Sequence, residues 1–283
     1  MTGPDAPALA EDRPDSAPAE ARLRRIMAIC NQKGGVGKTT TAINLATALA
    51  AVGRKVLVFD LDPQGNASTG LGIGREQRED GTYRVLLGES DVAHAAVETA
   101  VPGLWVVPAS VDLSGAELEL VDLERREFRL REAFAGAELP YDYILIDCPP
   151  ALGLLTLNAM VAADAVLVPL QCEFLALEGL SQLVRTIERV GAALNPGLSI
   201  QGIVLTMFDA RNNLSVQVAD DVRAYFGDKV YRTMIPRNVR VSEAPSFGKP
   251  ALIYDLKCAG SQAYLRLARE VVAREKTRRL QAA

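Results

Sequence analysis

Eight consecutive residues, 33–40, have the composition and order of a phosphate-binding loop: Lys-Gly-Gly-Val-Gly-Lys-Thr-Thr. Glycine lets backbone N–H groups approach a phosphate where a Cβ atom would obstruct them. The Lys-Thr pair supplies a cation for the β- and γ-phosphates and a hydroxyl that ligates Mg²⁺. The loop therefore predicts a nucleoside triphosphate site. The residues expected around the phosphates are Lys33, Gly34, Gly35, Val36, Gly37, Lys38, Thr39 and Thr40.

The flanking residues predict that this loop joins a strand to a helix. Ahead of it, the run Arg25–Asn31 contains five successive apolar residues, as a buried strand does. After it, apolar side chains recur at helical spacing between Thr39 and Val52. The loop's N–H groups and the helix N-terminus then face one concavity, which favours an anion.

Two further apolar strands end in carboxylates. Lys55–Asp60 runs into Asp60-Leu-Asp62-Pro-Gln-Gly-Asn, which suits a mobile loop beside a metal-bound phosphate. Tyr143–Asp147 stops at Cys-Pro-Pro, and Asp147 has the Walker B form, in which the terminal carboxylate holds Mg²⁺ directly or through water. An acid ending a strand is usually a cap or turn residue. Because both follow a phosphate loop, we expect them to serve that site.

The rest of the chain alternates apolar runs with helical periodicity. This pattern predicts an α/β fold with a mostly parallel, twisted sheet flanked by helices on both faces, whose ligands collect at the carboxyl ends of the strands. The other strand candidates are Leu104–Val107, Ala165–Leu170, Ile200–Met207 and Val230–Ile235. The helix candidates are Ser114–Glu124, Arg126–Phe134, Leu154–Ala162, Ala176–Leu194, Val216–Phe226 and Gly260–Arg279.

Composition predicts one globular domain, residues 24–283, after an N-terminal tail. The 283 residues are 49% hydrophobic and 23% charged, enough for a large core. Residues 1–23 combine prolines, alanines and acids, and we expect them to be disordered. No apolar run approaches the roughly 18–20 residues of a membrane span, so a cytoplasmic location is expected. The four cysteines are scattered, which favours reduced core thiols.

Taken together, these motifs resemble the deviant Walker A ATPases, a group of P-loop NTPases, and within them the ParA/Soj chromosome- and plasmid-partitioning proteins. The resemblance covers about residues 24–275. The strict phosphate-loop pattern has a glycine six residues before the second lysine, where this chain has Gln32, and the family's pattern also lacks that glycine. Further matching segments begin at Gln171 (Gln-Cys-Glu-Phe-Leu-Ala-Leu-Glu-Gly-Leu), Leu205 (Leu-Thr-Met-Phe-Asp-Ala-Arg) and Ile235 (Ile-Pro-Arg-Asn-Val-Arg-Val-Ser-Glu-Ala-Pro-Ser).

The resemblance implies roles for individual residues in binding and slowly hydrolysing ATP with Mg²⁺. Lys33 matches the signature lysine that reaches the partner's phosphates in a homodimer, and Lys38 matches the phosphate lysine. Thr39, Asp62 and Asp147 match the surroundings of the Mg²⁺ ion, with Asp62 also tied to orientation of the attacking water and Asp60 supporting the metal shell. Pro236 and Asn238 match positions near the adenine.

The resemblance also implies partners. ATP would assemble a sandwich dimer that binds double-stranded DNA without sequence preference, and hydrolysis, stimulated by a ParB-type centromere-binding protein, would release it. A net charge of −4 argues against a general polyanion binder. However, much of the acidity lies in the tail, and the final helix is basic. Arg211 and Arg240 match family positions that contact DNA phosphates, so a nucleoid-associated protein is expected.

Three other classes of protein have the same kind of phosphate loop and are alternatives. A MinD-like, membrane-cycling ATPase requires a lipid-facing amphipathic C-terminal helix, but we expect the stripe of Tyr264, Leu267, Ala268 and Val271 to pack on the domain. An iron protein of the nitrogenase type requires exposed paired cysteines, for which Cys148 and Cys172 are the candidates. A small-molecule ligase or kinase requires a second substrate pocket, and the sequence shows no distinctive one.

Overall fold

The computed structural model describes residues 24–282, which contain one seven-stranded sheet with helices on both faces. The strand order is β3-β4-β2-β5-β1-β6-β7, and every pair is parallel except the antiparallel β3 and β4. The predicted fold class is confirmed. The predicted tail, residues 1–23, lies outside the described residues. The strands are β1 (Arg25–Ile29), β2 (Val56–Asp60), β3 (Val97–Glu98), β4 (Leu104–Val107), β5 (Tyr143–Asp147), β6 (Ala165–Gln171) and β7 (Ser199–Thr206).

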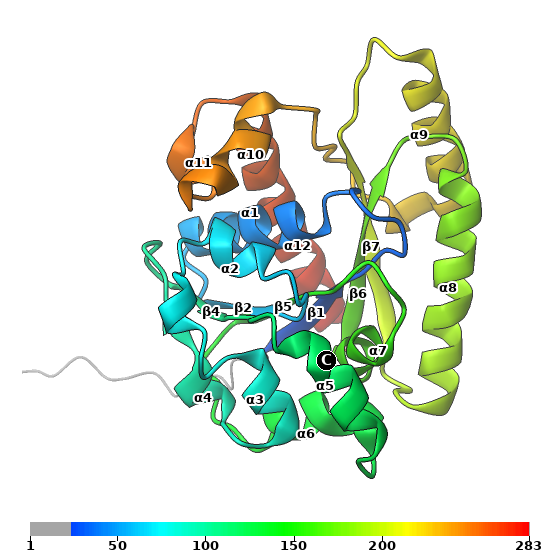
Figure 1. The fold of residues 1–283 in the computed structure, drawn as a ribbon. Helices are drawn as coiled ribbons and strands as arrows, with labels where there is room; N and C mark the ends of the chain where they lie inside the picture. The colour runs from blue at the N-terminus through cyan, green and yellow to red at the C-terminus, as the bar shows by residue number, and fades with distance from the viewer. Residues whose placement is uncertain (1–23, 283) are drawn as a thin grey trace, which may run out of the picture.

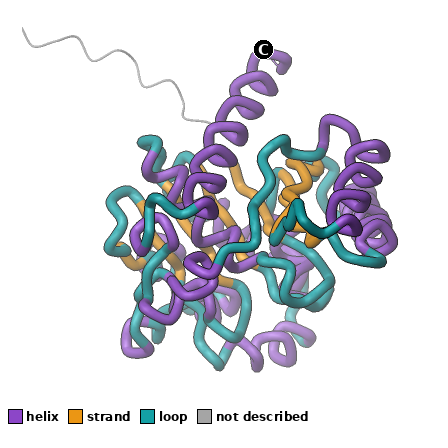
Figure 2. Tube along the Cα trace, turned by 90° about the horizontal axis from the view of Figure 1, so that it is seen from above, coloured by secondary structure: helices purple, strands orange, loops and turns teal. Residues whose placement is uncertain are grey.

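The helices form two layers (Figure 1), with α1, α2 and α10–α12 on one side of the sheet, α3–α7 on the other, and α8 and α9 beside β6 and β7. The last turns of α12 project from the body of the protein (Figure 2). The helices are α1 (Lys38–Ala51), α2 (Asn66–Gly70), α3 (Thr82–Leu87), α4 (Val92–Ala95), α5 (Leu113–Val121), α6 (Arg129–Ala135), α7 (Leu154–Ala162), α8 (Ala176–Ala193), α9 (Asn213–Phe226), α10 (Val239–Glu243), α11 (Ala251–Tyr254) and α12 (Ala259–Ala282).

Side chains of β1 alternate between two separate hydrophobic cores. Met27 and Ile29 face α1 and α12, whereas Ile26 and Ala28 face the layer that contains α7 and α8. Successive residues of a strand point to opposite faces, so a strand covered on both sides must be apolar throughout. All five residues of β1, β2 and β5 are buried. This double burial fixes the strand ends that carry the loop and the acids.

One predicted strand, Val230–Ile235, is wrong. The segment runs beside β7, but only isolated bridges form, between Ile203 and Val230 and between Phe208 and Pro236. The reason is Glu270 of α12, whose carboxylate accepts hydrogen bonds from the backbone N–H groups of Arg232 (2.9 Å) and Thr233 (3.1 Å). These amides are thereby turned away from the sheet, and the ladder is broken in the middle of the segment.

The remaining predicted elements lie where expected, with shifted ends. The predicted helix Arg126–Phe134 is divided into a short 3-10 turn, Arg126–Phe128, followed by α6. The region after Asp62, predicted as a mobile loop, contains the short helix α2. The apolar stripe of the final helix is buried as predicted, because Tyr264, Leu267, Ala268 and Val271 pack in the core shared with α1.

Candidate nucleotide-binding site

The glycines of the 33–40 loop form an open cradle at the carboxyl end of β1. Gly35 (φ 74°) and Gly37 (φ 88°) adopt left-handed backbone conformations that an L side chain takes up only with strain. Gly34 has no such conformation, and a Cβ atom added to it would meet nothing within 4 Å. The space in front of Gly34 is therefore free to hold a ligand group, which fits the expected phosphate position.

Helix α1 begins directly at the end of this cradle. Gly37 is its N-cap and, as a glycine, provides no side-chain hydrogen bond to the first N–H groups of the helix. The first N–H groups of a helix lack partners within it and carry the positive end of the helix dipole. A helix of 14 residues that starts without a cap or an acidic first turn is suited to bind an exogenous anion.

Two polar side chains brace the loop, one from Asn31 after β1 and one from Thr206 at the end of β7. Asn31 donates from Nδ2 to the Pro169 carbonyl (2.7 Å) and accepts from the Lys33 N–H (3.0 Å). On the other side, the Thr206 hydroxyl donates to the Val36 carbonyl (2.8 Å). The contacts with Pro169 and Thr206 join residues far apart in sequence, and sequence reasoning missed them. The loop is thus held to β6 and β7 before any ligand binds.

The two lysines of the loop differ in burial and in their partners. Lys38 is only 7% exposed, and its Nζ donates to the Lys33 carbonyl (3.2 Å), so the side chain wraps over the loop. Burial lowers the pKa of Lys38, while the nearby Asp147 carboxylate acts against this shift. Lys33 instead leaves half of its side chain exposed and forms an ion pair with Glu173 (Nζ to Oε2, 2.5 Å). Only Lys38 is therefore positioned to serve a phosphate in its own loop.

Asp147 is buried, and neither of its carboxylate oxygens has a hydrogen-bond partner among residues 24–282. Burial raises its pKa well above the usual value, and the neighbouring Asp60 raises it further; Thr39 and Lys38 act in the opposite direction. A buried charge normally carries partners, because leaving it unpaired is costly. A divalent cation held between Asp147 and the adjoining Thr39 would satisfy this carboxylate, so these residues fit the Mg²⁺ site expected from the sequence.

Within residues 24–282, no group of three or more His, Cys, Asp or Glu side chains is arranged to hold a metal. This is compatible with Mg²⁺, which proteins usually bind through one or two side chains together with substrate phosphates and water. The metal would accordingly be completed by the nucleotide rather than by the chain alone.

The two acids after β2 have different surroundings. Asp60 is fully buried opposite Asp147 on the neighbouring strand and accepts hydrogen bonds from the Ser68 hydroxyl (2.6 Å) and N–H (2.8 Å). Burial raises the pKa of Asp60 to about 6. Asp62 is 8% exposed, and its Oδ1 accepts from the Gln64 N–H (3.0 Å). Asp60 therefore joins β2 to α2. The negative charge of Asp62 raises the pKa of Lys38 and so favours the charged form of this lysine.

A cavity of ≈190 Å³ opens beside the loop and contains the predicted adenine contacts. Pro236 and Asn238 line it together with Gly37 and Thr40 of the phosphate loop. Asn238 also caps α10 by accepting from the Val241 N–H (3.3 Å). Sequence reasoning did not assign the other lining residues, which are Thr206, Met207, Ile235, Arg237, Val241, Ser242 and Tyr264.

Backbone strain is concentrated beside this site. Leu175 (φ 69°) and Met207 (φ 50°) are two of the three non-glycine residues with positive φ in the described chain. They follow the carboxyl ends of β6 and β7, and Leu175 lies two residues from Glu173. Each such conformation costs about 1–2 kcal/mol and persists where surrounding contacts impose it. Leu175 and the adjacent Phe174 are also exposed (61% and 75%).

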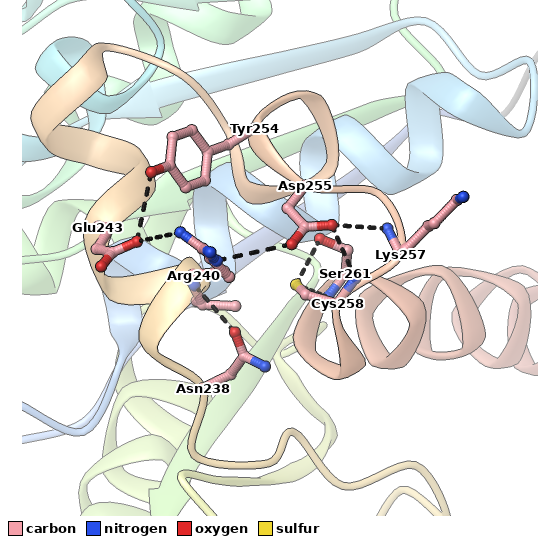
Figure 3. A network of polar contacts seen from close by, with 9 residues as sticks. Asn238, Arg240, Glu243, Tyr254, Asp255, Lys257, Cys258 and Ser261 are labelled. Atoms are coloured by element: carbon pink, nitrogen blue, oxygen red, sulfur yellow. Dashed lines mark hydrogen bonds and ion pairs between the residues drawn. The ribbon is translucent and has the colours of Figure 1, made fainter.

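Of the two arginines predicted to contact DNA, Arg211 lies between β7 and α9 and Arg240 lies in α10, and both have partners within the chain. Arg211 is 89% exposed and makes a two-pronged contact with Asp209 (2.9 Å for each bond). Arg240 pairs with Glu243 (3.1 Å) and lies 3.8 Å from Asp255 (Figure 3). A phosphate would have to compete with these carboxylates.

The cysteines do not form an exposed pair. Cys148 and Cys172 are buried, which removes the surface position that an iron–sulfur cluster at a subunit interface requires. Cys30 and Cys148 lie side by side with 3.2 Å between their sulfurs, and all four cysteines are free thiols. In the part of the chain that the structure describes, no helix combines the length and hydropathy needed to cross a bilayer.

Known proteins that are similar to this chain include ParA and Soj proteins. A family model described as "AAA domain" matches residues 24–200. The chain is 69% identical to the chromosome partitioning protein ParA of Caulobacter vibrioides, over 92% of this chain and 98% of that protein. It is 54% identical to the sporulation initiation inhibitor protein Soj of Bacillus subtilis, over 89% and 99%. Among solved structures, cobyrinic acid a,c-diamide synthase of Mycobacterium smegmatis, with bound ATP analog and magnesium, is 38% identical with a TM-score of 0.78 over 90% and 96%.

Proposed function

Because this chain belongs to the ParA/Soj family of chromosome-partitioning P-loop ATPases, we propose that it is a Mg²⁺-dependent ATPase whose ATP-bound form is a DNA-binding homodimer. Hydrolysis, stimulated by a ParB-type partner, returns it to a monomer that leaves the DNA. The proposed location is the cytoplasm, in association with the nucleoid. The names of the two relatives support a role in chromosome partitioning, and the remainder is argued below.

The different orientations of Lys33 and Lys38 carry the proposal. Lys38 is turned into the loop and is available to the β- and γ-phosphates of ATP in the same subunit. Lys33 is turned out of the loop towards Glu173 and cannot serve the same phosphates without leaving that ion pair. An exposed cation at the rim of a phosphate site can be contributed to a second subunit, as an arginine finger is in other NTPases. Exposed Phe174 and Leu175 beside it provide apolar surface for that subunit.

Hydrolysis requires positioning and neutralisation of charge rather than covalent catalysis. Bound Mg²⁺ would neutralise part of the phosphate charge, and Thr39, Asp62 and Asp147 are the residues proposed to hold it. Asp62 is also proposed to orient the attacking water, because it is the acid at the loop that keeps some solvent exposure. Pro236 and Asn238 would contact adenine in the cavity beside Gly37.

The test is the molar mass of the protein with ADP or ATP, measured by light scattering after size exclusion. We expect wild type to dimerise with ATP only and Lys38→Ala to lose every nucleotide effect. Lys33→Ala should bind ATP but remain monomeric, and Asp62→Ala should remain a dimer on DNA. Lys55→Ala, which removes an exposed lysine at the opposite ends of the strands, is the matched control and should behave as wild type. A monomeric Asp62→Ala in excess ATP would contradict the scheme.

DNA binding is proposed to depend on Arg211 and Arg240 from both subunits. Combining weak phosphate contacts in a dimer raises the apparent affinity and makes it strongly dependent on salt. Arg211→Gln and Arg240→Gln should each weaken ATP-dependent binding to unrelated duplex sequences equally and reduce the salt slope by about 1 for each phosphate contact removed. Arg185→Gln, an exposed arginine on α8, should leave both unchanged. Unchanged binding by both variants would rule out this surface.

A further inference from the structure

A surface groove of ≈620 Å³ lies between the second half of α12 and residues 227–232, which follow α9. It is distant in sequence from the nucleotide loop and has no role in the function proposed above. Four arginines line it: Arg223, Arg232, Arg274 and Arg278. The acidic lining residues are only Asp228 and Glu270. The groove wall therefore carries an excess of positive charge.

The acids of the groove do not neutralise this charge. Glu270 is engaged by the backbone amides of Arg232 and Thr233 and by the Arg274 guanidinium (3.2 Å). Arg274 is further held with its guanidinium 3.9 Å from the centre of the Tyr231 ring, so it is fixed in place. The exposed Arg232 side chain has no carboxylate within ion-pair distance among residues 24–282. The groove thus presents positioned guanidinium groups, one of them unpaired, to an acidic partner.

The N-terminal tail enters the described structure at the edge of this groove. Arg25, the first residue of β1, pairs with Glu275 (3.2 Å), and the groove residue Arg278 pairs with the other oxygen of the same carboxylate (3.1 Å). One carboxylate therefore joins the start of the described chain to the groove wall. Any segment preceding Arg24 is tethered beside the groove, at a high effective concentration.

The tail has the complementary charge. Residues 1–23 contain two arginines, Arg13 and Arg22, and five acids, Asp5, Glu11, Asp12, Asp15 and Glu20. An extended chain spans about 3.3–3.6 Å per residue, so Glu20 can reach roughly 17 Å from Arg25 and Glu11 about 45–50 Å. Both Glu20 and Glu11 can therefore reach the groove, because Arg25 and the groove residue Arg278 pair with the same carboxylate, that of Glu275. The acids also recur along the tail, so several can engage the arginines together.

From the groove's charge, its position at the start of β1 and the tail's acidity, we infer that residues 1–23 of the same chain dock in the groove lined by Arg223, Arg232, Arg274 and Arg278. The contact is electrostatic and is weakened by salt, since exposed charges are screened over about 10 Å at 0.1 M ionic strength. A docked tail covers guanidinium groups that would otherwise attract other polyanions. The tail is then a built-in competitor for this surface.

Zero-length carbodiimide cross-linking of the full-length protein tests this, because it joins carboxylates only to lysines that they contact. Lys229 adjoins the groove in sequence and Lys276 lies in the same turn of α12 as Arg274, whereas Lys55, Lys249 and Lys257 lie elsewhere in the chain. We expect tail peptides linked within one chain to Lys229 or Lys276 at about 20 mM NaCl and a several-fold lower yield at about 500 mM. Arg232→Gln combined with Arg278→Gln should lower the yield similarly, and Arg185→Gln combined with Arg189→Gln on α8 should not.

A second measurement does not depend on cross-links. Replacing the five tail acids by their amides should speed hydrogen exchange in the last turns of α12 at low salt, because the docked tail no longer covers them. Even linking to all exposed lysines, together with exchange that is unaffected by the tail acids, would overturn the proposal. So would a loss of DNA affinity in the Arg232/Arg278 variant without any link from the tail, since the groove would then bind nucleic acid instead.

Discussion

Lys33 and Glu173 form an ion pair across the opening of the phosphate loop, with 2.5 Å between Nζ and Oε2. The two residues are separated by 140 positions in sequence, and both side chains are about half exposed. This pair holds the loop lysine whose side chain is half exposed. In the proposed dimer, Lys33 would have to leave Glu173 before it could reach the phosphates of the second subunit.

Glu173→Gln should make ATP-dependent dimerisation easier. An exposed ion pair contributes about 0.2–1 kcal/mol, and a symmetric dimer breaks two such pairs, one in each subunit. The protein concentration needed for half-maximal dimer should therefore fall by about 2- to 30-fold. Sedimentation velocity across a protein dilution series measures the shift. Glu178→Gln, an exposed acid in the first turn of α8, is the matched control. A weaker dimer in Glu173→Gln would show that Glu173 supports the assembled form instead.

Alanine at Gly34 and at Gly37 should separate ligand binding from folding. Gly37 has a φ of 88°, so Gly37→Ala should lower the free energy of unfolding by about 1–2 kcal/mol. Gly34 has no positive φ and open space in front of it, so Gly34→Ala should be as stable as wild type. We propose that the phosphates bind against the Gly34 backbone, where the added methyl group would obstruct them, so Gly34→Ala should lose nucleotide binding. Urea denaturation and calorimetric titration with ATP measure the two effects. Nucleotide binding by Gly34→Ala at wild-type affinity would contradict the proposed position of the phosphates.

Asp147→Asn should stabilise the nucleotide-free protein while removing its response to magnesium nucleotide. Burial disfavours the charged form of this carboxylate, which has no hydrogen-bond partner among residues 24–282, so a neutral amide should raise the free energy of unfolding by about 1–3 kcal/mol. Scanning fluorimetry without and with Mg-ATP follows both changes. The exposed Asp221→Asn is the control and should change neither. A variant that is less stable than wild type without nucleotide would show that Asp147 has a partner in the free protein.

The stability of the nucleotide-free protein should depend on Asp60 between about pH 4 and pH 6. Because burial raises the pKa of Asp60 to about 6, the folded state keeps a proton that the unfolded state has lost across this window. The contribution of Asp60 to the free energy of unfolding therefore falls as pH rises and levels off above about pH 6, by about 2–3 kcal/mol in total. Comparing urea denaturation of wild type and Asp60→Asn at each pH isolates this contribution. A difference between the two that stays constant from pH 4 to pH 7 would contradict it.

Local sequence patterns predicted those parts of the fold and site that depend on local chemistry. Apolar runs place β1, β2 and β5, and the glycines and Lys-Thr pair indicate the loop because each residue type has a direct role there. Contacts between distant segments could not be predicted in this way. The ion pair of Lys33 requires Glu173, the loop is braced by Thr206, and Asp60 accepts a hydrogen bond from Ser68 of α2. The predicted strand Val230–Ile235 failed for the same reason, since Glu270, 37 and 38 residues away, takes its amides.

That interrupted segment also protects the protein from self-association through its sheet. β7 would otherwise present a free row of backbone donors and acceptors, which is a template for pairing with another molecule. The N–H groups of Tyr231 and Ile235 bond to the carbonyls of Ile203 (2.9 Å) and Leu205 (2.8 Å), so the outer side of β7 is already occupied. The N–H groups of Arg232 and Thr233, between these two residues, donate to Glu270. The segment that covers β7 therefore has no continuous row of free donors with which another strand could pair.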